Sequence, residues 1–199
     1  MKKISSILIL FLLIFKTSVA NAYGSDPKIF VEELVKDAIS KLSDKNLNQE
    51  EKAEFVEKIA IENVDIHALG LYTLGELRKS TDSKDIDKYQ QAFEKYFLKS
   101  LTNRLTDYSS SNFIVTSAEK KSSKYTIVKS KVSQSQNNPE IKIDWRIYTK
   151  NPEKPLIRDL IVEGLSLART QKEEFASILN SNNDDINVLI LKLEEFISN

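Results

Sequence analysis

Two carboxylates near the end of the chain are spaced so that they could act as an acid and base pair. Asp159 and Glu163 are four residues apart in the run RDLIVEG, which places both on one side of a strand. Paired carboxylates can divide the tasks of general acid and general base when their surroundings separate their pKa values. Solvated or salt-bridged strand residues show the same spacing. We expect the structural role, and keep a small enzyme that uses this pair as the rival hypothesis.

Two further groups of residues suggest catalysis but are incomplete. The run from Gly164 through Ser166 to Ala168 resembles half of a nucleophile elbow without its second glycine, and serine is also common at strand-to-helix turns. His67 is the only histidine and there is no cysteine. A histidine-based metal cluster or a Cys-His pair therefore cannot form. We expect no catalytic residue, no metal site and no cofactor.

A basic stretch is the remaining polar feature. Lys120 and Lys121 precede a turn, and Lys129 and Lys131 follow it. Such a hairpin could meet a lipid phosphate or an acidic partner surface, and it could equally be a solvated edge.

Six helices are predicted around these residues from apolar spacing and capping patterns. Asp26 before Pro27 is typical of a helix start, and the aromatic residues after 83 recur at three or four positions. The predicted helices are 27–43, one opening at the capping box Asn48–Glu51, one capped by Asp65 and running to Leu74, 83–108, and two closing helices that start at the capping box Thr170–Glu173 and at the turn Asn182-Asn183.

After Tyr108 the apolar period changes to two, which predicts strands. The third is the clearest, with Ile141, Ile143, Trp145 and Ile147 on one face. The predicted strands are Asn112–Lys120, Lys124–Gln134, Glu140–Lys150 and Pro155–Glu163, with a turn at Asn137-Asn138-Pro139. This order predicts an α+β fold in which helices pack on one face of a four-stranded, mainly antiparallel sheet.

The beginning of the chain reads as a secretory signal. Lys2 and Lys3 precede the apolar run 4–15, and Ala20-Asn21-Ala22 is a small-residue cleavage site. We expect 1–22 to be a cleavable signal peptide and 23–199 to be a single, soluble domain. Three of the 29 basic residues lie in 1–22, which leaves 26 against 29 acidic residues and a net charge near −3. Such a charge argues against nucleic acid as a partner.

Two stretches resemble the MlaC family of periplasmic phospholipid-binding proteins, also called toluene-tolerance auxiliary proteins. The first runs from Asp65 through Gly70 to Arg78 and into the long helix, and the second is the run RDLIVEGLSL from Arg158. This chain has Pro155-Leu156 where the family often has tryptophan, and Gln171-Lys172 where it has Tyr-Arg.

The resemblance implies a cystatin-like or nuclear-transport-factor-like fold that holds acyl chains between sheet and helices. It also implies a monomeric phospholipid shuttle of Gram-negative bacteria that maintains outer-membrane lipid asymmetry. Its partners would be an inner-membrane ABC transporter complex with an MCE-domain protein and an outer-membrane lipoprotein complex. A hopanoid or other polycyclic lipid is the alternative cargo.

The facing periodicities of the long helix and the sheet suggest which residues line such a pocket, although a packed core would give the same pattern. The predicted lipid-binding residues are Leu69, Leu74, Phe93, Phe97, Leu101, Ile143, Trp145, Ile147, Leu160 and Val162. Gly70 and Gly75 could make the stretch 65–78 a moving lid, or could instead allow close packing or end a helix.

Overall fold

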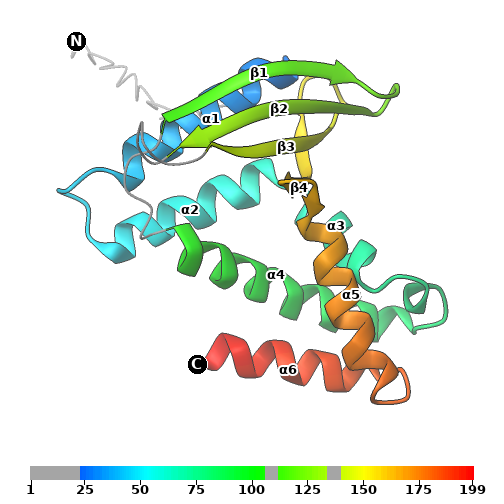
Figure 1. Ribbon diagram of the computed structural model, residues 1–199. Helices are drawn as coiled ribbons and strands as arrows, with labels where there is room; N and C mark the ends of the chain where they lie inside the picture. Colours follow the sequence, from blue (N-terminus) through cyan, green and yellow to red (C-terminus); the bar gives the residue numbers. More distant parts are fainter. Residues whose placement is uncertain (1–22, 106–111, 134–139) are drawn as a thin grey trace, which may run out of the picture.

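The structure is a computed structural model that describes residues 23–105, 112–133 and 140–199 (Figure 1). The predicted signal peptide, the last residues of the predicted helix 83–108 and the turn at Asn137-Asn138-Pro139 lie outside the described residues. The elements are α1 Pro27–Leu42, α2 Gln49–Asn63, α3 Ile66–Thr73, the 3-10 turn η1 Leu77–Lys79, α4 Ser83–Leu105, β1 Asn112–Lys120, β2 Tyr125–Ser133, β3 Ile141–Tyr148, β4 Leu156–Val162, β5 Leu165–Ser166, α5 Leu167–Asn180 and α6 Ile186–Ser198.

Side-chain caps begin the first three helices where the sequence predicts them. The Asp26 carboxylate accepts from two backbone N–H groups of α1, and Asn48 forms the complete capping box with Glu51. Asp65 caps α3 by accepting from the N–H of Ala68 at 3.2 Å. Each cap satisfies N–H groups that have no partner within the helix.

The predicted start of the first closing helix is wrong. Its cap is Ser166, whose hydroxyl oxygen accepts from the N–H of Arg169, so α5 begins at Leu167. Thr170 already lies within the helix and donates its hydroxyl proton to the carbonyl of Ser166. The local Thr170–Glu173 pattern therefore does not form a capping box.

The α+β class is confirmed, but the antiparallel sheet has five strands, in the order β1-β2-β3-β4-β5, instead of four. The extra strand, β5, has two residues and follows a tight turn at Glu163 and Gly164, both of which have positive φ. Side chains alternate between the sheet's two faces. We call one the α1 face, represented by Val128, Trp145 and Leu160, and the other the open face. The cystatin-like or nuclear-transport-factor-like label stays a prediction.

Among the described residues, buried apolar side chains form two clusters. The sheet cluster packs α1 against the sheet and contains Phe30, Val31, Leu34, Val128, Trp145, Ile147 and Ile157. The helical cluster is built from α2 to α6, including Tyr89, Phe93, Phe175 and Leu189. Figure 1 shows α1 beside β1 and β2, with the other long helices grouped below the sheet. Val64, at the end of α2, packs against both clusters. No helix in the described part of the chain is long and apolar enough to cross a membrane.

Two glycines of the stretch 65–78 have packing and helix-end roles. A Cβ on Gly70 would lie 2.4 Å from Gln90 Oε1 and 3.0 Å from Phe93 Cδ1, both on α4. Gly75 has φ +58° just after α3 and ends that helix. Close packing and helix termination therefore account for both glycines, and the lid stays an untested prediction.

The contact between α3 and α4 predicts how Gly70→Ala changes the free energy of unfolding. Alanine is favoured over glycine in a helix by up to about 1 kcal/mol, whereas overpacking costs about 1 to 3 kcal/mol. Gly70→Ala should therefore lower the free energy of unfolding by about 1 kcal/mol in urea denaturation. The same change in a Gln90→Ala background should cost less, because the nearest clash is gone. A Gly70→Ala protein more stable than the parent would contradict this packing.

Candidate functional site

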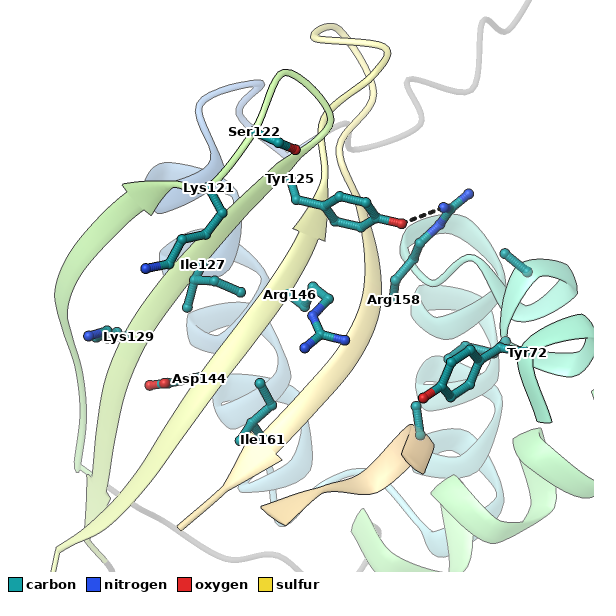
Figure 2. A pocket seen from close by; sticks show the side chains of 13 residues that line it. Tyr72, Lys121, Ser122, Tyr125, Ile127, Lys129, Asp144, Arg146, Arg158 and Ile161 are labelled. Atoms are coloured by element: carbon teal, nitrogen blue, oxygen red, sulfur yellow. Dashed lines mark hydrogen bonds between the residues drawn. The ribbon is translucent and has the colours of Figure 1, made fainter. Parts of the chain in front are cut away.

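A cleft of about 700 Å³ lies on the open face, between the sheet and the starts of α3 and α5 (Figure 2). Its floor comes from β2, β3 and β4 and its side wall from the two helices. The lining residues are Ala68, Leu69, Tyr72, Lys121, Ser122, Tyr125, Ile127, Lys129, Asp144, Arg146, Arg158, Ile161 and Ala168.

A β-bulge shapes this cleft. On β3 the neighbours Arg146 and Ile147 pair with Asp159 and Ile157 of β4, so Arg158 is the extra residue. A bulge interrupts side-chain alternation, and here the consecutive residues Arg158 and Asp159 each contact groups at the cleft. Arg158 binds Asp65 at the start of α3, and Asp159 binds the start of α5.

Arg158 ties α3 to the sheet. Its Nη2 and Nε lie 2.6 and 2.8 Å from Asp65 Oδ2, and its Nη1 donates to the Tyr125 hydroxyl at 2.8 Å. The guanidinium also lies 3.5 Å from the centre of the Tyr148 ring, within cation–π distance. Burial opposes its charge, but the hydrogen bonds to Tyr125 and Asp65 hold the pKa of Arg158 above its usual value. It remains a cation under all physiological conditions.

Asp159 ties α5 to the sheet. Its side chain is 1% exposed; it accepts from the Ser166 hydroxyl at 2.6 Å and from the Ala168 N–H at 3.0 Å. Arg146 Nη1 lies 3.4 Å from the same carboxylate. A carboxylate beside the first N–H groups of a helix is also favoured by the helix dipole. The motif from Asp159 to Ser166 thus forms a strand-to-helix joint.

These contacts weigh against the acid and base pair. Glu163 accepts from the backbone N–H of Lys142 on β3, whereas Asp159 is bound by α5 and Arg146. The Ser166 hydroxyl is used twice, once to donate to Asp159 and once to cap α5. Both carboxylates and the serine therefore serve as structural partners. His67 is exposed on α3, and the described residues contain no group of three metal-ligating side chains.

The predicted lipid-binding residues divide between the two apolar clusters. Leu74 and Phe93 are buried in the helical cluster, with Leu69, Phe97 and Leu101 half-buried against it. Trp145 and Ile147 are buried in the sheet cluster, with Ile143 and Leu160 half-buried against it. Val162 is half-buried and pairs with Ile143. Of the ten, only Leu69 lines the cleft on the open face.

The α1 face carries an apolar row that α1 does not cover completely. Ser130, Ile143, Val162 and Leu165 are direct cross-strand partners from β2 to β5, so their side chains share this face. The exposed fraction rises along the row, from 2% at Ser130 through the half-buried Ile143 and Val162 to 61% at Leu165. Ile141, on the same face, is 39% exposed. The β3–β5 part of this face therefore presents apolar surface that no helix in the described part of the chain fully covers.

The sequence predicted only part of this apolar surface. Alternation put Ile141 and Ile143 on one face, although Ile141 was not among the predicted lipid-binding residues. Leu165 was missed because a strand of two residues leaves no alternating pattern.

Comparisons with known proteins identify a family and a solved structure of similar fold. Residues 32–195 match the family described as MlaC protein. A phospholipid-binding protein from Ralstonia solanacearum, solved in complex with a phospholipid, has the same fold with a TM-score of 0.70 and 17% sequence identity. That likeness covers 86% of this chain and 96% of the Ralstonia chain. No curated protein matches this chain.

The joint at Asp159 predicts a stability effect. Asp159→Ala would leave the Ser166 hydroxyl and the Ala168 N–H without their acceptor in a partly buried place. We expect a loss of about 3 kcal/mol in the free energy of unfolding, measured by urea denaturation. Asp144→Ala is the matched control, because Asp144 lies on the same sheet face without a hydrogen bond or ion pair to the described residues. Equal stability of the two variants would contradict the joint.

Proposed function

This chain belongs to the MlaC family, and on that premise we propose that it binds a phospholipid on the α1 face of its sheet and carries it across the periplasm. The single observation that supports the location is the apolar row ending at Leu165, which no helix among the described residues fully covers. The Ralstonia protein of the same fold is a phospholipid-binding protein, which supports the class of ligand.

The energetics favour such a surface over the cleft. Two acyl chains contain about 30 methylenes, and at about 0.8 kcal/mol each their exposure to water costs on the order of 20 kcal/mol. An aqueous carrier must cover most of that hydrocarbon with apolar side chains. The α1 face offers Ile143, Leu160 and Val162, whereas the open face carries Lys129, Asp144 and Arg146. We therefore assign the acyl chains to the α1 face.

The half-buried residues of the predicted set are the ones that we assign to direct contact with lipid. On the sheet these are Ile143, Leu160 and Val162, and on the helices Phe97 and Leu101. The half-buried Leu69 is set apart from them, because it lines the cleft on the open face. The buried members Leu74, Phe93, Trp145 and Ile147 would support the walls behind them. Trp145 donates its indole N–H to Ser130 Oγ at 2.9 Å, and this bond fixes the ring between β2 and β3.

Transport also needs partners. Acyl chains are already shielded from water in a bilayer, so they gain little free energy by moving into an apolar pocket. A net direction must come from complexes that bind the loaded and empty carrier differently. We propose an inner-membrane ABC transporter complex with an MCE-domain protein at one end and an outer-membrane lipoprotein complex at the other. In this account the protein acts as a monomer, reaches the periplasm through the signal peptide 1–22 and maintains outer-membrane lipid asymmetry.

A charge on the apolar row should remove the lipid. Val162→Asp places a carboxylate where acyl chains would lie, and burying an unpaired charge there is unfavourable. Native mass spectrometry of the mature protein from a Gram-negative host should show phospholipid on the parent protein and at least tenfold lower occupancy on Val162→Asp. Ile114→Asp is the control, because Ile114 is exposed on the open face of β1.

Two outcomes would count against the proposal. Parent protein that stays free of lipid after incubation with liposomes would remove the lipid-binding function. Extraction of a hopanoid without phospholipid would replace the cargo by a rigid polycyclic lipid.

A further inference from the structure

The cleft on the open face is separate from the surface assigned to acyl chains. Ile127, Arg146 and Ile161 line the cleft, and their positions alternate with Val128, Trp145 and Leu160 on the α1 face. The sheet itself therefore stands between the two sites. A volume of about 700 Å³ is in the usual range for small-molecule sites.

The floor of the cleft holds hydrogen-bond donors that have no partner among the described residues. Lys129 is exposed and makes no side-chain hydrogen bond or ion pair with the described residues. Arg146 makes one ion pair with the described residues, to Asp159 at 3.4 Å, and its side chain is 43% exposed. A guanidinium has five N–H donors, so most of those on Arg146 remain available. Figure 2 shows Arg146 over the middle of the cleft floor, with Lys129 on one side and Arg158 on the other.

The cleft is not strongly cationic overall. Asp65 and Asp159 offset Arg158 and Arg146, and Glu119 pairs with Lys121. Asp144 lies directly across from Lys129 on the next strand. Selection for an anion would therefore come from the free donors of Lys129 and Arg146, which favours an oxyanion that can accept several hydrogen bonds.

The wall of the cleft is apolar. Ala68, Leu69 and Tyr72 of α3 form it together with Ala168 of α5, and Ile161 continues it onto the sheet. Tyr72 is 40% exposed and extends this wall to the surface. A ligand in the cleft would thus meet hydrocarbon on one side and free cationic donors on the other.

We propose that the open-face cleft binds the phosphate group of an amphipathic molecule, with its oxygens on Arg146 and Lys129 and its hydrocarbon on Leu69, Tyr72 and Ile161. This second site goes beyond lipid carriage on the α1 face and does not depend on it. A phosphate with a hydrocarbon tail would come from a lipid, whereas a soluble phosphate ester would lack the apolar contacts.

Isothermal titration calorimetry on the full mature chain, purified with whatever lipid it carries, tests the site with three probes. Octyl phosphate should bind, while inorganic phosphate and octanol, which each lack one half of the ligand, should bind at least tenfold more weakly. Lys129→Gln and Arg146→Gln should each weaken octyl phosphate about tenfold, as expected for a lost charged hydrogen bond. Lys131→Gln is the matched control, because Lys131 is on the same sheet face but outside the cleft and pairs with Glu140.

The outcomes separate this site from the carrier function. Val162→Asp should leave octyl phosphate affinity unchanged, since it alters only the α1 face. Octyl phosphate binding that is lost in Val162→Asp, or is equal in the parent, Lys129→Gln and Arg146→Gln proteins, would overturn the second site. Inorganic phosphate binding as tightly as octyl phosphate would overturn the amphipathic ligand and identify a soluble phosphate as the source.

Discussion

The bulge in β4 is the constraint on which the arrangement of sheet and helices depends. By inserting Arg158 into the register, it lets two consecutive side chains reach the starts of two helices, Arg158 that of α3 and Asp159 that of α5. In a regular strand these neighbours would point to opposite faces and only one could do so. The backbone reinforces the link, because Val64 bridges Ile157 and the N–H of Asp65 donates to the Ile157 carbonyl at 2.9 Å. Polar contacts at one strand thus join two apolar clusters.

This joint explains how a small protein can keep apolar surface available. α1 packs mainly on β1 and β2, and α3 and α5 are tied to β4. The apolar row from Ile143 to Leu165 is therefore not fully covered by any helix that the structure describes. A fully packed sheet would be more stable but would have no place for hydrocarbon. Exposed apolar surface of this kind commonly marks a binding site. The open face, with its charged floor, is suited to a different and more polar ligand.

The sequence predicted the elements well where the information was local. Strict alternation revealed β3, and Asp26, Asn48 and Asp65 marked the first three helix starts. The sequence patterns failed where residues distant in the chain determine where an element begins. The start of α5 depends on Asp159, which accepts from the N–H of Ala168 across the turn, so the local pattern at Thr170 was misleading.

The candidate site shows the same limit. Periodicity identified which side of α4 and of β3 is apolar, but it could not show that these surfaces belong to two different clusters. The bulge was equally hidden, because Arg158-Asp159 reads like any alternating strand pair. Asp159 and Glu163 had the spacing of a catalytic pair. Only the hydrogen bonds of each carboxylate revealed its structural role.

Photo-crosslinking with a phospholipid that carries a diazirine on its acyl chain tests the central claim most directly. After irradiation of the loaded protein, peptide mass spectrometry should find the label on the α1 face, at Ile143, Leu160, Val162 or Leu165. Loaded protein in which none of these four residues carries the label would contradict the assignment of the acyl chains to the α1 face.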